Sequence, residues 1–380
     1  NELRSPFSFG LSGDPLFPIV SCVIFYLCII LSVISIFINY KNLKLQHYLF
    51  LFFSFYLAYS SIRNVPFFLL AAIFIIGISF NKIKEKVFKY KKYISFAIIA
   101  LCILFSVRVI NGNYYASDKR GDEFGLGLNY NLKPVETGKF LTANNLNGRV
   151  LNDIISGSWL EWQTKYPVFI DGRLEVMKEK LATEYAKSSA DVKSFSDLLK
   201  KNNIELCVFN YTLIPNWLTY LSKDSTFRLV YFDDIDCIFL RNGYHDDIRT
   251  VDFDSMANYI NFPVDIDISG VNNILNKKKI NPVSKWFNGF VESANYSEVL
   301  KDGNIGFFLM RSGQPFKAEP YLLRALNTAN YNLENIYLML GAVYIDEGKF
   351  DKAYFSLTKV LQISPDNQTA KLLLSKIKSR

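Results

Sequence analysis

Polar residues follow two expected strands between residues 149 and 173, and their types and spacing suit a binding site. A short apolar strand at 149–151 leads into Asn152, and a second strand at 167–170 ends on Asp171, Gly172 and Arg173. The carboxyl ends of neighbouring strands are where α/β domains usually place a ligand. An arginine there suits a phosphate, because its guanidinium presents a planar fork of donors.

Between these strands, a turn at Gly157 leads into a helix start that carries Trp159 and Trp162. Indole rings can stack on sugars, but they also occur in cores and at membrane interfaces. The whole stretch has a simpler structural interpretation, in which the two glycines only make turns. Asp171 then caps one turn, and Arg173 pairs with it.

The block ND…SGSWLEW followed by PVFIDGR resembles the segment after the last transmembrane helix of bacterial polytopic proteins related to the C-type glycosyltransferases. Those enzymes take sugars from polyprenyl-phosphate donors. Their pattern has an Asn and a Gly-Tyr-Leu-like turn, where this chain has Ser158 and Trp159. The resemblance covers about residues 1–241 and implies the C-terminal half of such a protein in the bacterial inner membrane.

The resemblance also places the catalytic Asp or Glu in a first extracytoplasmic loop, upstream of Asn1. The chain starts with Asn1 and shows no signal-peptide pattern. We therefore expect a fragment that does not catalyse alone and that needs no cofactor. Asn152, Trp159, Asp171 and Arg173 would contact a polyprenyl-phosphate sugar, together with Arg63. Arg63 could equally be a snorkelling interface residue.

The apolar residues are concentrated between 16 and 110, although the whole chain of 380 residues is 50% hydrophobic. We expect four membrane spans, at about 16–39, 48–62, 65–80 and 93–110. Pro66 interrupts the long apolar run of 48–80. A helical hairpin with Arg63 at its tip is expected there, and one long kinked helix is the alternative.

The formal net charge of +8 is explained by lysine-rich loops between these spans. Loops 40–47 and 81–92 carry most of the lysines of this region, which places them in the cytoplasm by the positive-inside rule. Everything after residue 111 is then extracytoplasmic. The lipid bilayer is thus the expected partner of residues 1–110, and nucleic-acid binding is not expected.

Residues 111–241 read as a small α/β domain, because strand-like and helix-like stretches alternate. A helix is expected at 190–202, and strands at 205–210, 227–232 and 237–241. Cys207 and Cys237 lie in these strands as two buried thiols or a disulfide. The turn with Asp233, Asp234 and Asp236 is expected to be a solvated hairpin rather than a calcium site. With two histidines in the chain, no metal site is expected.

After a linker at 242–282, residues 283–380 show a helical period and an internal repeat. The clear copies are about 299–332 and 334–367, and 368–378 forms a closing helix. The copies match the tetratricopeptide pattern, in which small residues let paired helices approach and a proline stops the second helix. The packing residues are Gly306, Ala318, Tyr337, Gly341, Tyr344, Ala353 and Pro365.

The fold class is therefore multi-domain: a transmembrane helical bundle, a small α/β domain and an all-α repeat array. Two functions follow. The chain is part of a glycosyltransferase-like membrane protein, or it is a non-catalytic membrane-anchored scaffold that binds a protein through its repeats. A transporter fragment has little support, because Arg63 is isolated in its span.

Overall fold

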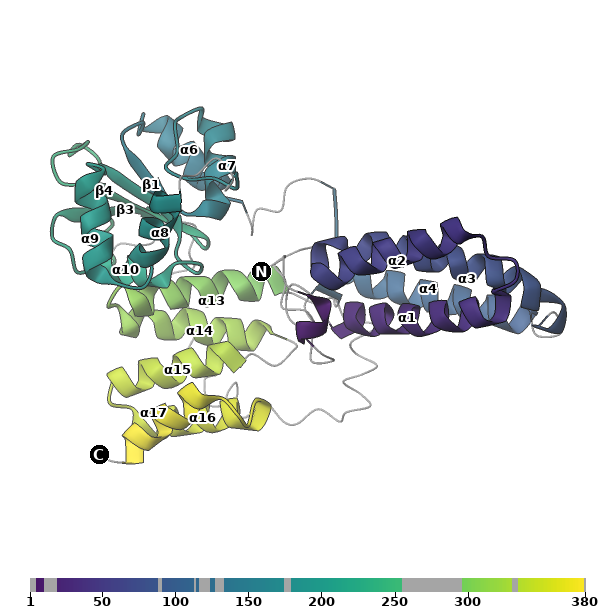
Figure 1. Cartoon of the computed structure of the whole chain (residues 1–380). Helices are drawn as coiled ribbons and strands as arrows, with labels where there is room; N and C mark the ends of the chain where they lie inside the picture. The colour runs from purple at the N-terminus through teal and green to yellow at the C-terminus, as the bar shows by residue number, and fades with distance from the viewer. Residues whose placement is uncertain are drawn as a thin grey trace. The chain divides into compact units, whose positions relative to one another are not determined.

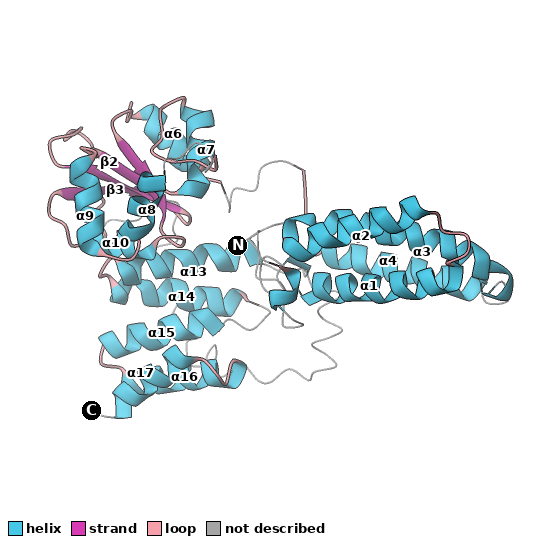
Figure 2. Cartoon of the chain, in the orientation of Figure 1, coloured by secondary structure: helices cyan, strands magenta, loops and turns pink. Residues whose placement is uncertain are grey.

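The computed structural model describes residues 5–9, 19–87, 91–112, 114–115, 124–126, 133–173, 179–254, 296–329 and 334–378. The chain divides into two compact units (Figure 1). The first comprises residues 1–120 with 290–292, and the second comprises 121–289 with 293–380. The described residues form fourteen α-helices and one four-stranded sheet (Figure 2).

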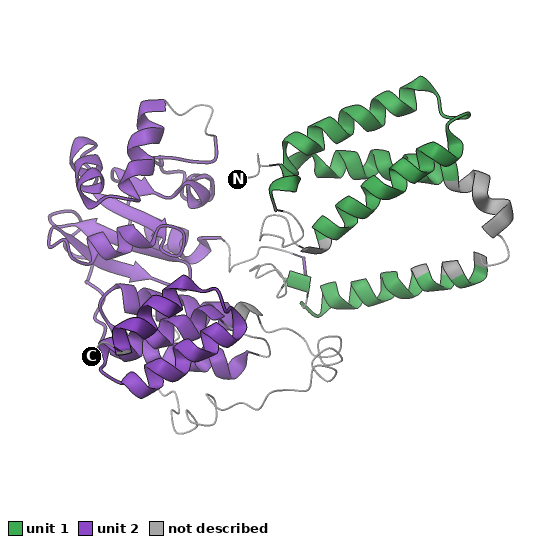
Figure 3. Cartoon of the chain, turned by 60° about the horizontal axis from the view of Figure 1, so that its bottom comes forward, with its two compact units in different colours: residues 1–120, 290–292 green, residues 121–289, 293–380 purple. Residues whose placement is uncertain are grey.

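The first unit is a helical bundle, shown in green in Figure 3. Its α-helices are α1 (Ile19–Asn39), α2 (Leu45–Ser60), α3 (Val65–Val87) and α4 (Lys91–Ile110). Helix α3 packs on both α1 and α2, where small residues such as Ala58, Ala71 and Ala72 are fully buried. Many large apolar side chains on the outside of these helices are exposed.

Two stretches of this unit are long and apolar enough to cross a membrane, Ser21–Asn39 and Ile62–Ser79. Ile99–Ile110 is a shorter apolar stretch. Among the described residues, two of the four expected spans are therefore long and apolar enough to cross a membrane, by length and composition alone. This is a weak indication of membrane association.

The apolar run at 48–80 forms the expected helical hairpin rather than one kinked helix. Helix α2 ends at Ser60, and the 3-10 turn η2 (Ile62–Asn64) connects it to α3. The Asn64 side-chain amide donates to the Leu57 carbonyl at 3.1 Å, which fastens the turn to the end of α2. Pro66 lies in the first turn of α3, where a helix loses nothing from a missing N–H.

In the second unit, four strands pair in the order β1-β2-β4-β3. These are β1 (Val150–Asn152), β2 (Leu206–Asn210), β3 (Phe227–Phe232) and β4 (Asp236–Arg241). Strand β1 runs parallel to β2, and the other pairs are antiparallel. Three of the predicted strands, 205–210, 227–232 and 237–241, are confirmed to within one residue.

Strand β2 reads as a continuous apolar run because both of its faces are covered. Leu206 and Val208 pack with residues of α6 (Val135–Ala143) and α7 (Ile154–Thr164) on one face. Cys207 and Phe209 pack on the other face with α9 (Val192–Lys201) and α10 (Pro215–Leu221). The cysteines Cys207 and Cys237 are free, buried thiols, so no disulfide joins them.

Helix α9 confirms the helix predicted at 190–202. The Asp191 side chain caps it by accepting from the Ser194 N–H at 2.7 Å, and Phe195, Leu198 and Leu199 bury one face. The preceding helix, α8, spans Glu179–Ser188.

Residues at the start of the predicted linker, 242–254, pack on the sheet. The Val251 N–H donates to the Leu229 carbonyl at 2.8 Å, and Val251 is buried. The guanidinium of Arg228 donates to the carbonyls of Tyr244 and His245. The linker prediction is therefore wrong for this part, because backbone contacts with β3 hold it. Residues 255–295, which include the rest of the linker, lie outside the described residues.

The C-terminal helices are α13 (Tyr296–Arg311), α14 (Pro315–Thr328), α15 (Glu334–Asp346), α16 (Phe350–Ile363) and α17 (Gln368–Lys378). Helix α13 pairs with α14, and α15 pairs with α16. We call these five helices the helical array. Pro365 is exposed just beyond the end of α16, where it cannot continue the helix.

The two helix pairs of the array repeat the same contact thirty-five residues apart. A Cβ on Gly306 would lie 2.5 Å from Leu322, and a Cβ on Gly341 would lie 2.6 Å from Leu357. The turns repeat as well, with left-handed glycines at Gly313 and Gly348. The internal repeat seen in the sequence is thus a repeat of backbone approach and turn conformation.

The sheet and the helical array share one hydrophobic core. The rings of Phe232 on β3 and Phe308 on α13 stack with centroids 4.2 Å apart. Tyr211 lies edge-on to Phe308, and the Asn304 amide donates to the Asp234 carbonyl at 2.8 Å. Among the described residues, the sheet is thus what covers the first helix of the array.

Candidate functional site

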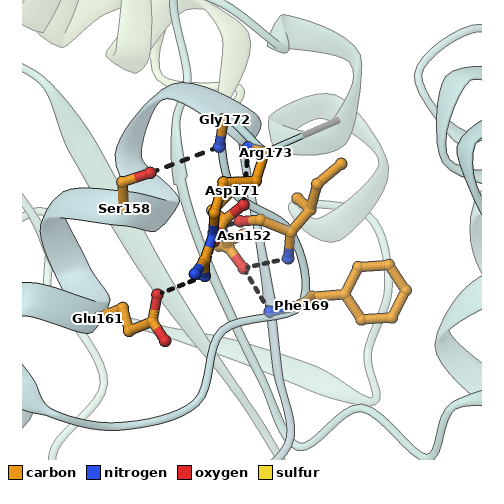
Figure 4. A network of polar contacts seen from close by, with 8 residues as sticks. Asn152, Ser158, Glu161, Phe169, Asp171, Gly172 and Arg173 are labelled. Atoms are coloured by element: carbon orange, nitrogen blue, oxygen red, sulfur yellow. Dashed lines mark hydrogen bonds and ion pairs between the residues drawn. The ribbon is translucent and has the colours of Figure 1, made fainter. Parts of the chain in front are cut away.

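Asn152, at the end of β1, is fully buried and joins two segments of chain (Figure 4). Its amide nitrogen donates to the Ile170 carbonyl at 2.7 Å and to the Asp153 carbonyl at 2.8 Å. Its oxygen accepts from the N–H groups of Phe169 and Ile170. All of its polar atoms are used, so Asn152 is a structural clamp and has no free group for a ligand.

The predicted strand at 167–170 is absent from the sheet, so that prediction is wrong. The segment lies along β1 but pairs with the Asn152 side chain instead of a neighbouring strand. Pro167 has no N–H to give to a ladder, which contributes to this result. The apolar residues at 167–170 resemble a strand in the sequence. In the structure, Ile170 of this run is buried although the run is not part of the sheet.

Gly157 in α7 allows this clamp to close. A Cβ at that position would lie 2.0 Å from the Ile170 carbonyl oxygen and 2.7 Å from the Asn152 amide nitrogen. Both distances are far below contact, so any side chain would push the 167–170 segment away from the helix. The glycine is there for close approach rather than for the predicted turn, since it lies inside α7.

Asp153 is the buried N-cap of α7, and it also binds the end of β2. One carboxylate oxygen accepts from the N–H groups of Ile155 and Ser156, and the other accepts from the Asn210 N–H at 2.9 Å. The carboxylate thereby satisfies donors that the first turn of the helix leaves free. An Asp directly before a helix start is a capping signal, so this role of Asp153 could have been predicted from the sequence.

The turn after the clamp, Asp171-Gly172-Arg173, is closed by its own charges (Figure 4). The Arg173 guanidinium pairs with Asp171 and, at 3.1 Å, with Glu161 on α7. These hydrogen bonds from Arg173 lower the pKa of Asp171. Arg173 is thus already engaged by two carboxylates of the described residues, which disfavours its use for a bound phosphate. The geometry matches the turn-and-pair interpretation of this stretch.

Trp159 and Trp162 are adjacent on α7, with ring centroids 5.0 Å apart. The Trp159 indole N–H donates to Gln163, whose amide donates in turn to the Val135 carbonyl of α6. Trp159 is half-buried and joins the two helices. Trp162 is 62% exposed, with the Lys165 amine 5.6 Å from its ring centroid. Of the two rings, Trp162 is the one open to a sugar or a lipid.

Arg63 belongs to the other unit, in the turn η2 of the helical hairpin. Its side chain is exposed, and no residue among those described forms an ion pair with it. Unlike Arg173, it therefore keeps a cation that is not neutralised by the described carboxylates.

The repeat-packing residues lie at the helix contacts that the pattern predicts. Gly306 and Gly341 meet the facing leucines, and Ala318, Ala353 and Tyr344 are fully buried. Tyr337 is partly buried against the core of the array. These residues hold the helices together and offer no chemistry of their own.

In the acidic turn between β3 and β4, Asp233 and Asp234 are half-buried and Asp236 is buried, so the solvated-hairpin prediction is wrong for Asp236. Asp236 is fully buried, and the Asp233 carboxylate accepts from the Ile235 and Asp236 N–H groups and from Tyr231. Thr137 of α6 covers the turn with its hydroxyl. No group of residues suited to a metal ion is found among the described residues.

Comparisons of this chain with protein-family models, with curated proteins and with solved structures give no match.

Proposed function

We propose that this chain is a membrane-anchored scaffold whose helical array is a tetratricopeptide-type module that binds another protein of the bacterial cell envelope. The observation that carries the proposal is the shared core of the sheet and the array. An array of two repeats needs covers at both ends. The sheet covers α13, and α17 packs on α16.

With its ends covered, the array keeps one face on which repeat-equivalent residues reach the surface. Phe307 and Ala342 are both half-buried, as are Met310 and Ile345. The next positions, Arg311 and Asp346, are exposed and of opposite charge. Apolar side chains next to single charges of both signs suit a peptide segment rather than a membrane or a nucleic acid.

Site-specific photo-crosslinking in native membranes tests this proposal. A crosslinking residue at Arg311 and one at Asp346 should both capture the same protein. A matched position is Tyr354 on α16, which is 48% exposed and lies outside this face. Identical products from all three positions, or no product from the first two, would contradict the proposal.

We further propose that all four helices α1–α4 cross the bilayer, with the lysine loops in the cytoplasm and the second unit extracytoplasmic. Glu85→Cys and Thr250→Cys variants in intact cells test the orientation. An impermeant thiol reagent should label position 250 and spare position 85. The native Cys207 and Cys237 are buried, and the native chain without either variant measures the background from Cys28 and the exposed Cys102. The reverse pattern of labelling would contradict this orientation.

A second candidate function is the C-terminal half of a glycosyltransferase-like protein that acts on polyprenyl-phosphate sugars. It is supported by the resemblance of the 152–173 block and by the exposed Arg63, which no described carboxylate pairs with. The use of Asn152, Asp171 and Arg173 in internal contacts counts against it. We therefore place this function second.

A further inference from the structure

The turn between β3 and β4, which leads into the buried Asp236, lies where three parts of the second unit meet. Helix α6, the first helix of this unit, reaches the turn through Thr137. The sheet supplies the turn itself, and α13 of the array binds its backbone through Asn304. A change in the turn therefore acts on the start of the unit and on the array together.

Two carboxylates in this turn compete for one hydroxyl. The Thr137 hydroxyl oxygen lies 3.3 Å from an oxygen of Asp233 and 3.3 Å from an oxygen of Asp236. A hydroxyl has one hydrogen to donate, so it cannot satisfy two ionised carboxylates. The second contact becomes a hydrogen bond only if one carboxyl carries a proton and donates it to the threonine oxygen.

The surrounding donors decide which carboxyl carries the proton. Asp233 accepts from two backbone N–H groups, from the Tyr231 hydroxyl and from Thr137, so its negative charge is well compensated. Asp236 is fully buried, and its second oxygen has no hydrogen-bond partner among the described residues. An ionised Asp236 would be a buried charge beside another, which is costly.

Other charged groups around the turn add to this asymmetry. Asp153 at the end of β1 and Asp234 in the turn raise the pKa of Asp236 further, after burial and the charge of Asp233. Lys301 of α13 lowers the pKa of Asp234, and Asp302 raises it. Glu136 of α6 raises the pKa of Tyr231. The remaining neighbour is the Tyr211 hydroxyl, which donates to the Asp233 carbonyl at 2.8 Å.

We propose that Asp236, Thr137 and Asp233 form a proton-dependent latch that holds α6 on the β3–β4 turn. When α6 opens, Asp236 meets water and titrates at the ordinary aspartate pKa of about 4. The closed form keeps the proton to a higher pH. Opening therefore becomes up to about tenfold more frequent per pH unit from about pH 4 up to the closed-state pKa, and then levels off. The latch therefore holds α6 most strongly at low pH, where opening is least frequent.

Hydrogen exchange of the full chain in lipid nanodiscs tests the latch. The amides of α6, corrected for the intrinsic pH dependence of exchange, should lose protection by up to about tenfold per unit as pH rises from about 4. Asp236→Asn keeps the shape of the protonated carboxyl and should remove this dependence. Asp366→Asn, at a fully exposed aspartate of the array, should keep it.

Infrared spectroscopy gives a second readout that does not depend on opening. The native chain should show the band of a protonated carboxyl at neutral pH, and Asp236→Asn should lose it. Two results would overturn the latch: no such band in the native chain, or the same pH dependence of α6 exchange in Asp236→Asn as in the native chain. If Asp236→Asn does not fold, Thr137→Val should weaken the protection of α6 and leave the infrared band in place.

Discussion

At the scale of residues, this protein uses polar side chains chiefly to bind its own backbone. Asn152 replaces a missing strand partner for 167–170, and Asp153 joins a helix start to the end of β2. Leaving buried amides of this kind unpaired costs about 1–3 kcal/mol each. A stretch that looks like a binding site in sequence is therefore largely a device for closing a loop.

The two candidate phosphate-binding arginines differ in what surrounds them. Arg173 already pairs with Asp171 and Glu161, whereas Arg63 forms no ion pair with the described residues. We expect Arg173→Gln to leave the affinity of the nanodisc-embedded chain for a polyprenyl phosphate unchanged. If the second candidate function holds, Arg63→Gln should weaken that affinity by about tenfold, the effect of one charge-assisted hydrogen bond.

Arg108→Gln is the control from the same unit, because it removes an arginine from the last turn of α4, where Arg108 is half-buried and Arg63 is exposed. An equal loss in Arg63→Gln and Arg108→Gln would indicate general surface charge rather than a site. A loss in Arg173→Gln would contradict our assignment of that residue to a structural turn.

At the scale of elements, the array depends on two glycines that let helices touch. Replacing Gly341 by Ala places a methyl group against Leu357, and overpacking of this kind costs about 1–3 kcal/mol. Gly306→Ala should cost a similar amount, because the contact with Leu322 is nearly identical. Chemical denaturation of the full chain in detergent micelles measures both changes.

The double variant Gly341→Ala/Leu357→Ala is the control for this contact. If the methyl clash is the cause, the second substitution should cost less in Gly341→Ala than in the native chain. Additive losses would show that Gly341 acts through its backbone alone.

Elements whose signal is local could be predicted from the sequence. The helix predicted at 190–202 has its cap, Asp191, and its apolar face within one segment, and β2 is a continuous apolar run. The repeat was visible because it occurs twice. The prediction of a strand at 167–170 was wrong because this segment pairs with the side chain of Asn152. A hydropathy pattern does not show that kind of partner.

The prediction of a solvated acidic turn failed for a related reason. Its burial depends on Thr137, which is 96 residues from Asp233 in sequence. Three aspartates within four positions normally indicate a solvated turn, and a single sequence does not show which helix will cover them. The pairing of Arg173 with Asp171 was one of the two interpretations drawn from the sequence, whereas the hydrogen bonds of Asn152 to the 169–170 segment were not foreseen.

At the scale of the whole molecule, the second unit is best understood as an array with two covers. The sheet buries the open side of α13, and α17 packs on α16. These two covers bury the end faces of a short array, which it needs to be stable. The face formed by repeat-equivalent residues is then the surface left for a partner.

The sheet and the array share a core around Phe308, and we expect them to fold as one body. Hydrogen exchange of the full chain with Phe308→Ala tests it directly, with Phe307→Ala as the control on the same helix. Truncation of a fully buried Phe costs about 3–5 kcal/mol. We predict that β3, β4 and the helices α13–α16 lose protection together in Phe308→Ala, and that Phe307→Ala has a small effect. Loss of protection confined to α13 would contradict the claim.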